Sequence, residues 1–384
     1  MVIGANAADL RGCRRDEGGE SDNGEVEWML RQLWRLSRTI KTGAGGPTLR
    51  APAVYAERAG DDWRMRSANE MGYEGVACVD DAARLAVLLM RAVQDGLLPF
   101  SQALNWATET MEFLLYMQQP DGKFANFILD WTGEPNLHGP TSVPGGHSYQ
   151  TRAMWALSVA YRATAHPPYR EAYYRAVAAL PERPVYADTV ALAAYSVLES
   201  RIAFNDPELD RAAQRWCETV YETQADGLLL NHADEDPSHP HLWGYIQPGV
   251  LALASRRYGR PEWLEAARRV VDGYLAPLIE EEFKTTRTMP YETSSILFNC
   301  RKLHEAVGDG RYTDLGDLTR QWYHGRNAAR EPVYNPEAGM VFDGTDSDRV
   351  SLNSGAESNI EGGFALYDEL PWHLYRFENL NDGK

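Results

Sequence analysis

Two kinds of helical segment alternate along this chain, and that alternation restricts the fold more than any other feature. One kind carries its charged residues on a single face, as a helix at a protein surface does. It covers residues 25–41, 101–118, 168–180, 207–224, 261–282 and 311–327. The other kind is rich in Ala, Leu and Val, with few charges after its start, so neighbouring helices must cover it. It covers residues 76–93, 148–164, 187–203, 244–257, 293–306 and 357–369.

Six outer helices that alternate with six inner ones predict six helical hairpins closed into a ring. This is the all-α (α/α)6 toroid, here as a single domain over residues 25–384. An irregular all-α bundle and a superhelix of helix pairs are the alternatives, but a superhelix favours a repeat of fixed length, and these pairs vary in length. Long alternating strand patterns are absent from the sequence.

The connections between helices support the ring. Long connections lead from outer to inner segments, over residues 124–149, 228–249 and 331–358, whereas the returns are short, such as "FNDP" and "YGRP". Long loops rich in polar and aromatic residues on one rim predict a functional face, because a loop that only joins two helices can be short.

Composition limits the partners. A net charge of −17 opposes binding to nucleic acid or to an anionic membrane and favours a neutral or weakly charged small molecule. Residues 1–24 are polar and Gly-rich, which predicts a disordered tail rather than a signal peptide, and no apolar run approaches the ~20 residues of a membrane span. We therefore expect a cytoplasmic protein with reduced thiols. The four cysteines lack metal-site spacing: Cys13, Cys78, Cys217 and Cys300.

Carboxylates stand at the starts of the first and the last inner segments. One Asp suffices to cap a helix, so the pair Asp80 and Asp81, with Arg84 one turn later, needs a further explanation. Glu357 and Glu361 are four residues apart and share one helix face. In a closed ring the first and last inner helices are neighbours, so we expect these acids to meet in one cavity. The glycines at 362 and 363 indicate that something packs closely against this turn.

Other residues at the same rim are candidates for substrate binding, although each also has a structural explanation as a cap, a loop residue or a core residue. Asp188 in "YADTV", for example, is expected to be a helix N-cap. Aromatic faces beside carboxylates and imidazoles suit a sugar ring, which has an apolar face and a rim of hydroxyls; a terpenoid is an alternative. The candidates are Tyr73, Trp131, His147, Tyr149, Asp188, Trp243, Tyr245 and Glu292.

The chemistry that fits this site is glycoside hydrolysis. It needs one carboxyl group kept protonated as a general acid and another ionised as base or nucleophile, and crowding of acids in a semi-enclosed cavity raises some of their pKa values. Asp80 or Asp81 would pair with Glu357. A separation of roughly 6.5 to 9.5 Å would indicate an inverting enzyme, and about 5 to 5.5 Å a retaining one. No cofactor and no metal are expected, since the His-rich loop at residues 232–241 lacks the spacing of a metal motif.

Two stretches, "EGVACVDDAARLAVLL" and "GMVFDGTDSDRVSLNSGAESNIEGGFAL", resemble the six-hairpin glycosidase-like bacterial proteins. In that family a "VDD-x-AR" helix start is paired with an "N-SGAES-x-IE" helix start. The resemblance implies the toroid over residues 25–375 and an activity on carbohydrates. It departs from the family after the second Glu, where "GGFALYDELPW" replaces a longer aliphatic run. The residues it singles out are Asp80, Asp81, Arg84, Asn353, Ser354, Gly355, Glu357, Ser358 and Glu361.

Two other functions remain open. A lyase, isomerase or dehydratase with a non-sugar substrate could use the same toroid, because fold does not determine function. In that case Cys78 and Cys300 would matter, with His147 or Tyr149 as proton carriers, although both cysteines are also natural core residues. A non-catalytic sugar-binding or scaffold protein would hold aromatics in the pocket without well-placed acids.

Overall fold

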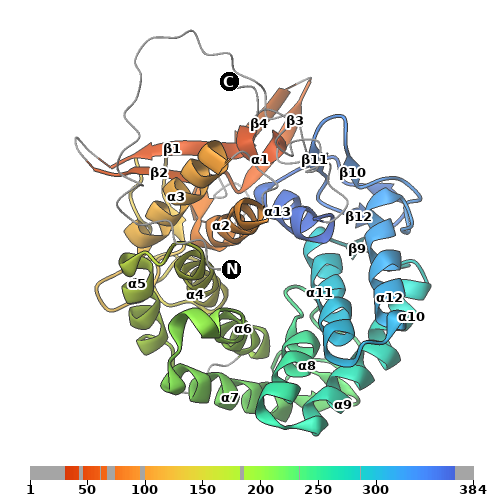
Figure 1. Ribbon diagram of the computed structural model, residues 1–384. Helices are drawn as coiled ribbons and strands as arrows, with labels where there is room; N and C mark the ends of the chain where they lie inside the picture. The colour runs from red at the N-terminus through yellow and green to blue at the C-terminus, as the bar shows by residue number, and fades with distance from the viewer. Residues whose placement is uncertain are drawn as a thin grey trace, which may run out of the picture.

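Six inner helices form a closed ring in the computed structural model, which describes residues 31–42, 46–60, 62–66, 74–95, 100–181, 186–232, 234–285 and 287–367. The predicted tail at residues 1–24 lies outside the described residues. Each inner helix packs against the next, and the last packs against the first, which confirms the (α/α)6 toroid (Figure 1). The inner helices are α2 (Val79–Gln94), α4 (His147–Thr164), α6 (Ala187–Phe204), α8 (Gln247–Tyr258), α11 (Pro290–Val307) and α13 (Ala356–Ala365).

Outer helices surround this ring, each packed on the inner helix that precedes it in sequence. The hydrophobic core lies between the two rings and is rich in alanine on the inner side, which allows close approach. The outer elements are α3 (Phe100–Met117), α5 (Pro167–Ala178), α7 (Pro207–Glu222), α9 (Pro261–Val270) with the π-helical η3 (Val271–Leu275) and α10 (Ala276–Glu280), and α12 (Gly310–Arg320) with the 3₁₀ turn η4 (Gln321–His324).

The N-terminal part differs from the prediction. In place of a helix over 25–41, the described residues contain a short helix α1 (Arg31–Leu36) and then strand β1 (Ser37–Lys41), paired antiparallel with β2 (Thr48–Pro52). A second hairpin pairs β3 (Tyr55–Ala59) with β4 (Asp62–Arg66). The β-branched pair Thr39 and Ile40 favours a strand, and Ile40 is fully buried.

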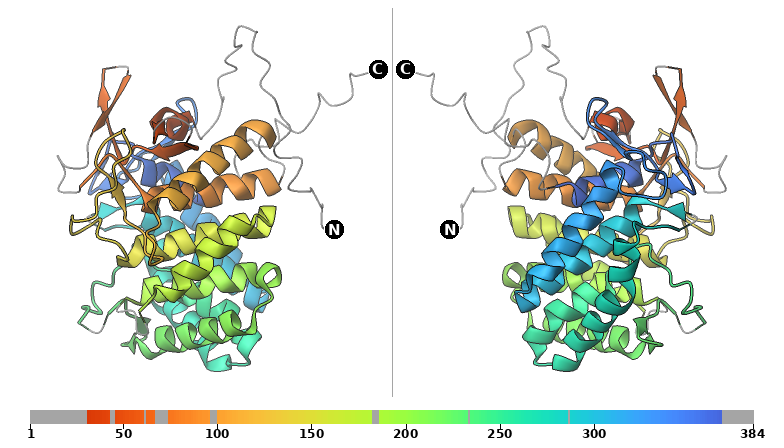
Figure 2. Two further views of the ribbon diagram at one scale, coloured as in Figure 1. Left: turned by 90° about the vertical axis from the view of Figure 1, so that its left-hand side faces the viewer. Right: turned by 90° about the vertical axis from the view of Figure 1, so that its right-hand side faces the viewer.

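All the long connections emerge on one side of the ring, as predicted (Figure 2). Short strand pairs hold them against that rim. They are β5 (Ala77–Cys78) with β6 (Phe127–Ile128), β7 (Gln224–Ala225) with β8 (Leu228–Leu229), β10 (Tyr334–Asn335) with β11 (Met340–Val341), and β12 (Thr345–Asp346) with β9 (Arg287–Thr288) and β13 (Arg349–Val350). Among the described helices, none is both long and apolar enough to cross a lipid bilayer.

The start of α13 is held by the "SGAES-N" stretch. Asn359 accepts a hydrogen bond from the Val341 backbone N–H at 2.8 Å and donates to Gly355 O at 2.7 Å and Ser354 Oγ at 2.8 Å. A Cβ at Gly362 would lie 2.5 Å from Val341, which confirms the close packing expected from the paired glycines. These contacts position the first turn of α13, the turn that carries the acidic residues.

Replacing Asn359 with Ala is expected to lower the free energy of unfolding by about 2 to 4 kcal/mol, because several buried polar groups lose their partner at once. Urea unfolding followed by tryptophan fluorescence measures this loss. Asn353→Ala is the matched control, since Asn353 is exposed in the same loop and its loss is expected to stay below about 0.5 kcal/mol. A loss below about 1 kcal/mol for Asn359→Ala would contradict the role given to its hydrogen bonds.

Candidate active site

Helix α2 is capped by a cysteine, not by either of the two aspartates. Cys78 occupies the N-cap position, and its Sγ accepts a hydrogen bond from the Asp81 backbone N–H at 3.4 Å. The loop before α4 supplies a second restraint through Asn126. Its side-chain Oδ1 accepts a hydrogen bond from Asp80 N at 3.2 Å, and its backbone oxygen accepts one from Val79 N at 2.8 Å. The side chains of Asp80 and Asp81 are therefore not needed for capping.

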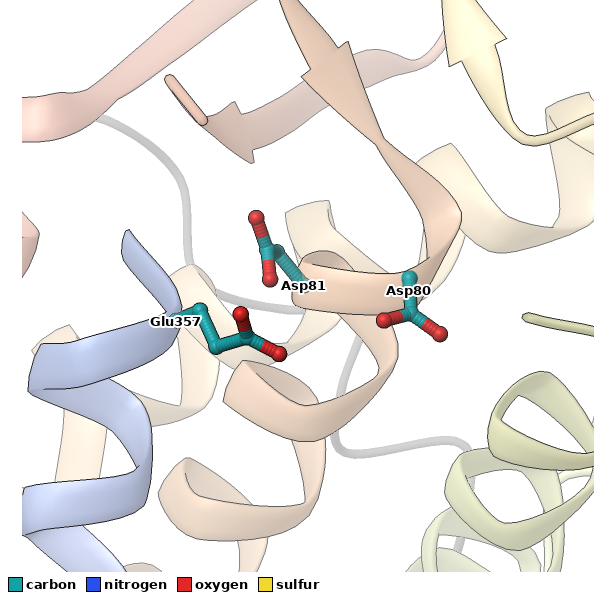
Figure 3. A group of neighbouring side chains, drawn as sticks. All are labelled: Asp80, Asp81 and Glu357. Atoms are coloured by element: carbon teal, nitrogen blue, oxygen red, sulfur yellow. The ribbon is translucent and has the colours of Figure 1, made fainter. Parts of the chain in front are cut away.

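Both aspartates bind Arg84, which joins the first inner helix to the last. Its Nη2 lies 2.8 Å from Asp80 Oδ2 and 2.9 Å from Asp81 Oδ1. Its Nη1 lies 2.6 Å from Glu357 Oε1 and 2.9 Å from Glu361 Oε1. Arg84 is only 2% exposed, so this is a buried guanidinium that bridges four carboxylates. Figure 3 shows three of these carboxylates, Asp80, Asp81 and Glu357, where the first turns of α2 and α13 face each other.

The cluster has more carboxylates than guanidinium groups. Arg152 Nη1 lies 3.2 Å from Asp80 Oδ2, so two arginines face four acids. Burial raises the pKa of Asp81 to about 7 against the opposing charge of Arg84, and the charges of Glu357 and Asp80 add to the increase. Burial also raises the pKa of Glu357, against the effect of Arg84 and Arg152. Asp81 therefore titrates near neutral pH, where a carboxyl group can both accept and donate a proton.

Asp81 gives the folded protein a definite dependence on pH. Its folded pKa of about 7 lies above its ordinary value of 3.8, so between these values the folded state binds more protons than the unfolded state. The contribution of Asp81 to stability is therefore most favourable below pH 4 and falls as the pH rises toward 7. Asn cannot ionise. We expect the melting temperature of Asp81→Asn, relative to the wild type, to increase from pH 5 to pH 8.

Scanning fluorimetry at several pH values measures this difference. Asp206→Asn is the control: Asp206 caps α7, Asn caps equally well, and the pKa of Asp206 is lowered by its hydrogen bond with Tyr174. The melting temperature of Asp206→Asn, relative to the wild type, should not change with pH above pH 5. The prediction fails if the melting temperature of Asp81→Asn, relative to the wild type, decreases as the pH rises. That result would show that Arg84 stabilises the ionised form of Asp81 more than burial destabilises it.

Trp243 joins the acid cluster from the loop before α8. Its Nε1 donates a hydrogen bond to Glu357 Oε1 at 3.1 Å. Its ring lies 5.1 Å from that of Tyr291, at an interplanar angle of 37°, and 5.9 Å from that of His241. The structure thus brings this predicted aromatic together with a predicted acid, although 114 residues separate them in the sequence.

A cavity of about 330 Å³ lies within the ring, lined by residues from all six inner helices or their approaches. Of the predicted residues, Arg84, Asp188 and Glu361 line it. Asp80, Asp81 and Glu357 are not part of the lining, but their ion-pair partners Arg84 and Arg152 are. The acid cluster therefore adjoins one end of the cavity, which it reaches through Arg84, Arg152 and Glu361.

Asp188 was expected to be an N-cap, and that prediction is wrong. Tyr186 occupies the cap position of α6, and Asp188 lies in the first turn, where its Oδ1 accepts from Thr189 N at 2.6 Å. Burial raises the pKa of Asp188, while His241 and Arg152 oppose the increase. It is one of four carboxyl groups that line the cavity, and it lies opposite the acid cluster in the ring order of the helices.

Several other predicted residues have structural partners away from the cavity. Trp131 lies beneath the guanidinium of Arg38, at 5.9 Å. Tyr245 is 1% exposed, and its hydroxyl accepts from Leu229 N. Glu292 Oε2 accepts from the Met289 N–H at 2.8 Å and so closes the first turn of α11.

Tyr149 is also buried. Its hydroxyl donates to Val143 O, and burial together with the charges of Asp80 and Glu74 raises its pKa to about 12. Asn353 is exposed in the loop before α13. Tyr73 and the side chain of His147 lie outside the described part of the chain.

The two cysteines considered for thiol chemistry are buried, Cys78 at 4% exposure and Cys300 at 0%. Burial raises the pKa of the Cys78 thiol, and that of Cys300 to about 12, so neither is a thiolate near neutral pH. Since the thiolate is the reactive form, these environments fit structural roles better than catalysis.

One oxygen atom each from Asp80, Asp81 and Glu357 lies within 4.8 Å of the others, which is the kind of donor set that binds a divalent cation. The guanidinium of Arg84 already contacts all three carboxylates, however, and supplies positive charge there. Arg84 thus takes the place that a metal ion would have among these carboxylates. The expectation of a site without metal stays a prediction.

Sequence reasoning missed the residues that line the cavity farther from the rim, including Arg91, Trp155 and Glu199. They lie on the middle and last turns of apolar helices, where they resemble ordinary core or surface residues. A usable signal was the isolated charge within an apolar run, as for Arg91 in "LLMRAV".

Comparisons with known proteins agree on the architecture. No family model and no curated protein matches this sequence. Solved structures do match: a sugar epimerase from a ruminal bacterium superposes with a TM-score of 0.63 and 11% identity, covering 90% of this chain and 97% of its own.

Two further structures give the same result. A family 76 α-mannanase from Bacteroides thetaiotaomicron has a TM-score of 0.55 at 12% identity, over 76% of this chain and 85% of its own. A cellobiose 2-epimerase from Bacillus thermoamylovorans has a TM-score of 0.57 at 10% identity, over 77% of this chain and 89% of its own. At such low identity the likeness shows the fold alone. The chain is a six-hairpin (α/α)6 toroid.

Proposed function

We propose that this protein is an enzyme that acts on carbohydrate by acid–base catalysis, with Asp81 and Glu357 as the working carboxyl pair. One observation carries the proposal: ring closure brings two carboxyl groups with raised pKa values together at the wall of a cavity. Trp243, hydrogen-bonded to Glu357 and stacked near Tyr291, adds the aromatic surface that a sugar ring favours. Enzymes named for mannan and for cellobiose share this toroid.

Glycoside hydrolysis is the reaction that fits the pair best. The two carboxyl groups differ in environment: 25% of the Glu357 side chain is exposed and 4% of the Asp81 side chain. Arg84 and Trp243 both donate to Glu357 and so oppose the effect of burial on its pKa, which makes Glu357 the better candidate for the nucleophile or base of the pair. Asp81, with its pKa of about 7, would supply the proton to the leaving oxygen. One oxygen of Asp81 and one oxygen of Glu357 lie within 4.8 Å of each other, so the two carboxyl groups are close enough to act on one substrate bond.

The test is an activity panel of cellobiose, mannobiose and p-nitrophenyl glycosides, with release of reducing ends as the readout. Glycoside hydrolysis is supported if reducing ends are released by the folded protein and not by the unfolded protein. If no substrate is cleaved or epimerised and both disaccharides still bind, the alternative of a non-catalytic sugar-binding protein replaces it.

Sugar epimerisation is a second candidate, favoured by the sugar epimerase whose chain is matched over 97% of its length. A carboxyl pair that can both accept and donate a proton near neutral pH could also move one at a carbon beside a carbonyl group. The same panel in D₂O separates the two reactions. An epimerase incorporates deuterium into the reducing-end ring without cleavage, whereas a hydrolase releases reducing ends and forms no C–D bond.

A further inference from the structure

Four aromatic rings form a nearly continuous wall in the cavity, away from the acid cluster. Trp155 on α4 lies 5.7 Å from Phe364 on α13 and 6.0 Å from Tyr195 on α6. Tyr195 in turn lies 5.0 Å from Phe298 on α11. All four rings line the cavity. We call these four residues the aromatic collar.

Charged groups border the collar. Glu199 accepts from Trp155 Nε1 at 2.7 Å and from Arg91 Nη2 at 2.8 Å. Lys302 lies 5.7 Å above the ring of Phe298 and pairs with Glu305 at 2.8 Å. Arg91 also lies over the rings of Trp155 and Phe364, at 5.3 and 5.7 Å. The collar thus combines aromatic surface with hydrogen-bonding groups of both signs beside it. This combination matches a neutral ring with an apolar face and a rim of hydroxyls.

The cavity is long compared with a single sugar ring. On α6 its lining extends from Asp188 to Glu199, and on α11 from Ser294 to Glu305. At about 1.5 Å per helical residue, each stretch of 11 steps spans roughly 16 Å. Arg84 lies toward one end of this length and Glu199 at the other, with the collar between them. Protein interiors seldom leave space of this size without a use, since close packing would otherwise fill it.

We propose that the aromatic collar is a subsite for a terminal ring of the substrate, so that the enzyme acts on oligosaccharides of two or more rings. This inference rests on the proposed function for the reaction at the acid cluster, but the subsite is defined by its own residues. A chain end would enter the collar, and the next linkage would lie near Arg84. A single ring fills part of the cavity and leaves either the collar or the Arg84 end unoccupied.

The test measures binding of cellobiose, mannobiose, glucose and mannose by isothermal titration calorimetry and tryptophan fluorescence, using the Glu357→Gln variant so that bound disaccharide persists. Leu192 also lines the cavity, and Leu192→Trp fills its space without removing a collar ring. Phe298→Leu removes a ring instead. Ile202→Trp is the matched control, because it adds the same ring to the same helix at a position 82% exposed.

We expect Leu192→Trp to weaken disaccharide binding by about tenfold or more, because an added ring in occupied space forces the ligand out. Phe298→Leu should weaken it less, and Ile202→Trp should leave it unchanged. Monosaccharide affinity should change by less than about threefold in every variant, since one ring can still bind at the Arg84 end. Two results in Leu192→Trp would overturn the subsite: an equal loss of affinity for monosaccharides and disaccharides, or an unchanged affinity for disaccharides.

The two proposals can fail separately. Turnover of a disaccharide with an unaltered KM in Leu192→Trp would leave the proposed function standing and reject the collar as a subsite. Disaccharide binding that is lost in Leu192→Trp, without any turnover by the wild type, would retain the subsite and reject the reaction. If neither disaccharide binds the wild-type chain at millimolar concentration, the subsite is rejected.

Discussion

Glu357→Gln is expected to lower kcat/KM for the cleaved or epimerised sugar by about 10² to 10⁴, and Asp81→Asn by a similar factor, because general acid–base groups typically contribute that much. Both changes retain the size and hydrogen-bonding shape of the side chain while removing its ability to exchange a proton. The double variant should lose little more than either single variant, since groups that act as a unit are not additive. Steady-state kinetics on the active member of the panel give the result.

Glu292→Gln is the matched control for that experiment. Glu292 is a half-buried carboxyl group in the first turn of another inner helix at the same rim, where it binds Met289 N and does not line the cavity. We expect its kcat/KM to stay within about threefold of the wild type. Turnover within tenfold of the wild type in both Asp81→Asn and Glu357→Gln would reject the proposed carboxyl pair.

Arg84→Met is expected to lower the free energy of unfolding at pH 8 by about 3 to 5 kcal/mol, because it leaves buried carboxylates without their shared cation. The loss should be smaller at pH 5. Without Arg84 the pKa values of Asp81 and Glu357 rise further, so the folded state takes up protons as the pH falls and the repulsion is relieved. Denaturant unfolding at both pH values measures the two losses.

Arg257→Met is the control for Arg84→Met. Arg257 pairs with Asp210 at 2.8 Å, with 42% of its side chain exposed, and such a surface pair contributes about 1 kcal/mol or less. Arg84→Lys retains a positive charge and is the variant to measure if Arg84→Met does not fold. A loss for Arg84→Met that is equal at pH 5 and pH 8 would mean that packing of the arginine stem, and not charge, explains its effect.

Local patterns were sufficient to locate most of the helices. The inner helix predicted at 187–203 is observed as α6 (Ala187–Phe204), and the outer helix predicted at 207–224 as α7 (Pro207–Glu222). The prediction failed at residues 37–41, where strand β1 replaces a helix. There the helical pattern of apolar residues was misleading, because pairing with Thr48–Pro52 satisfies the backbone as a strand.

The candidate site was only partly accessible from sequence. The acidic residues could be named, because two adjacent aspartates and a Glu four residues before another Glu exceed what helix capping requires. The contacts between helices could not be predicted: Trp243, itself a candidate, approaches Glu357 from a loop, and Arg152 approaches Asp80 from a different helix. No local pattern encodes a contact between segments that meet only when the ring closes.

By itself the sequence determined the alternation of surface and buried helices, the single rim of long loops and the identity of the acids, because periodicity and composition are local properties. Only the tertiary structure decided that Arg84 binds four carboxylates at once, that Cys78 and Tyr186 occupy the cap positions, and that an aromatic collar lines the cavity. Those features depend on distances between helices, and burial then sets the pKa of Asp81. Long-range geometry and desolvation arise only from packing, and together they convert an ordinary pair of aspartates into a candidate active site.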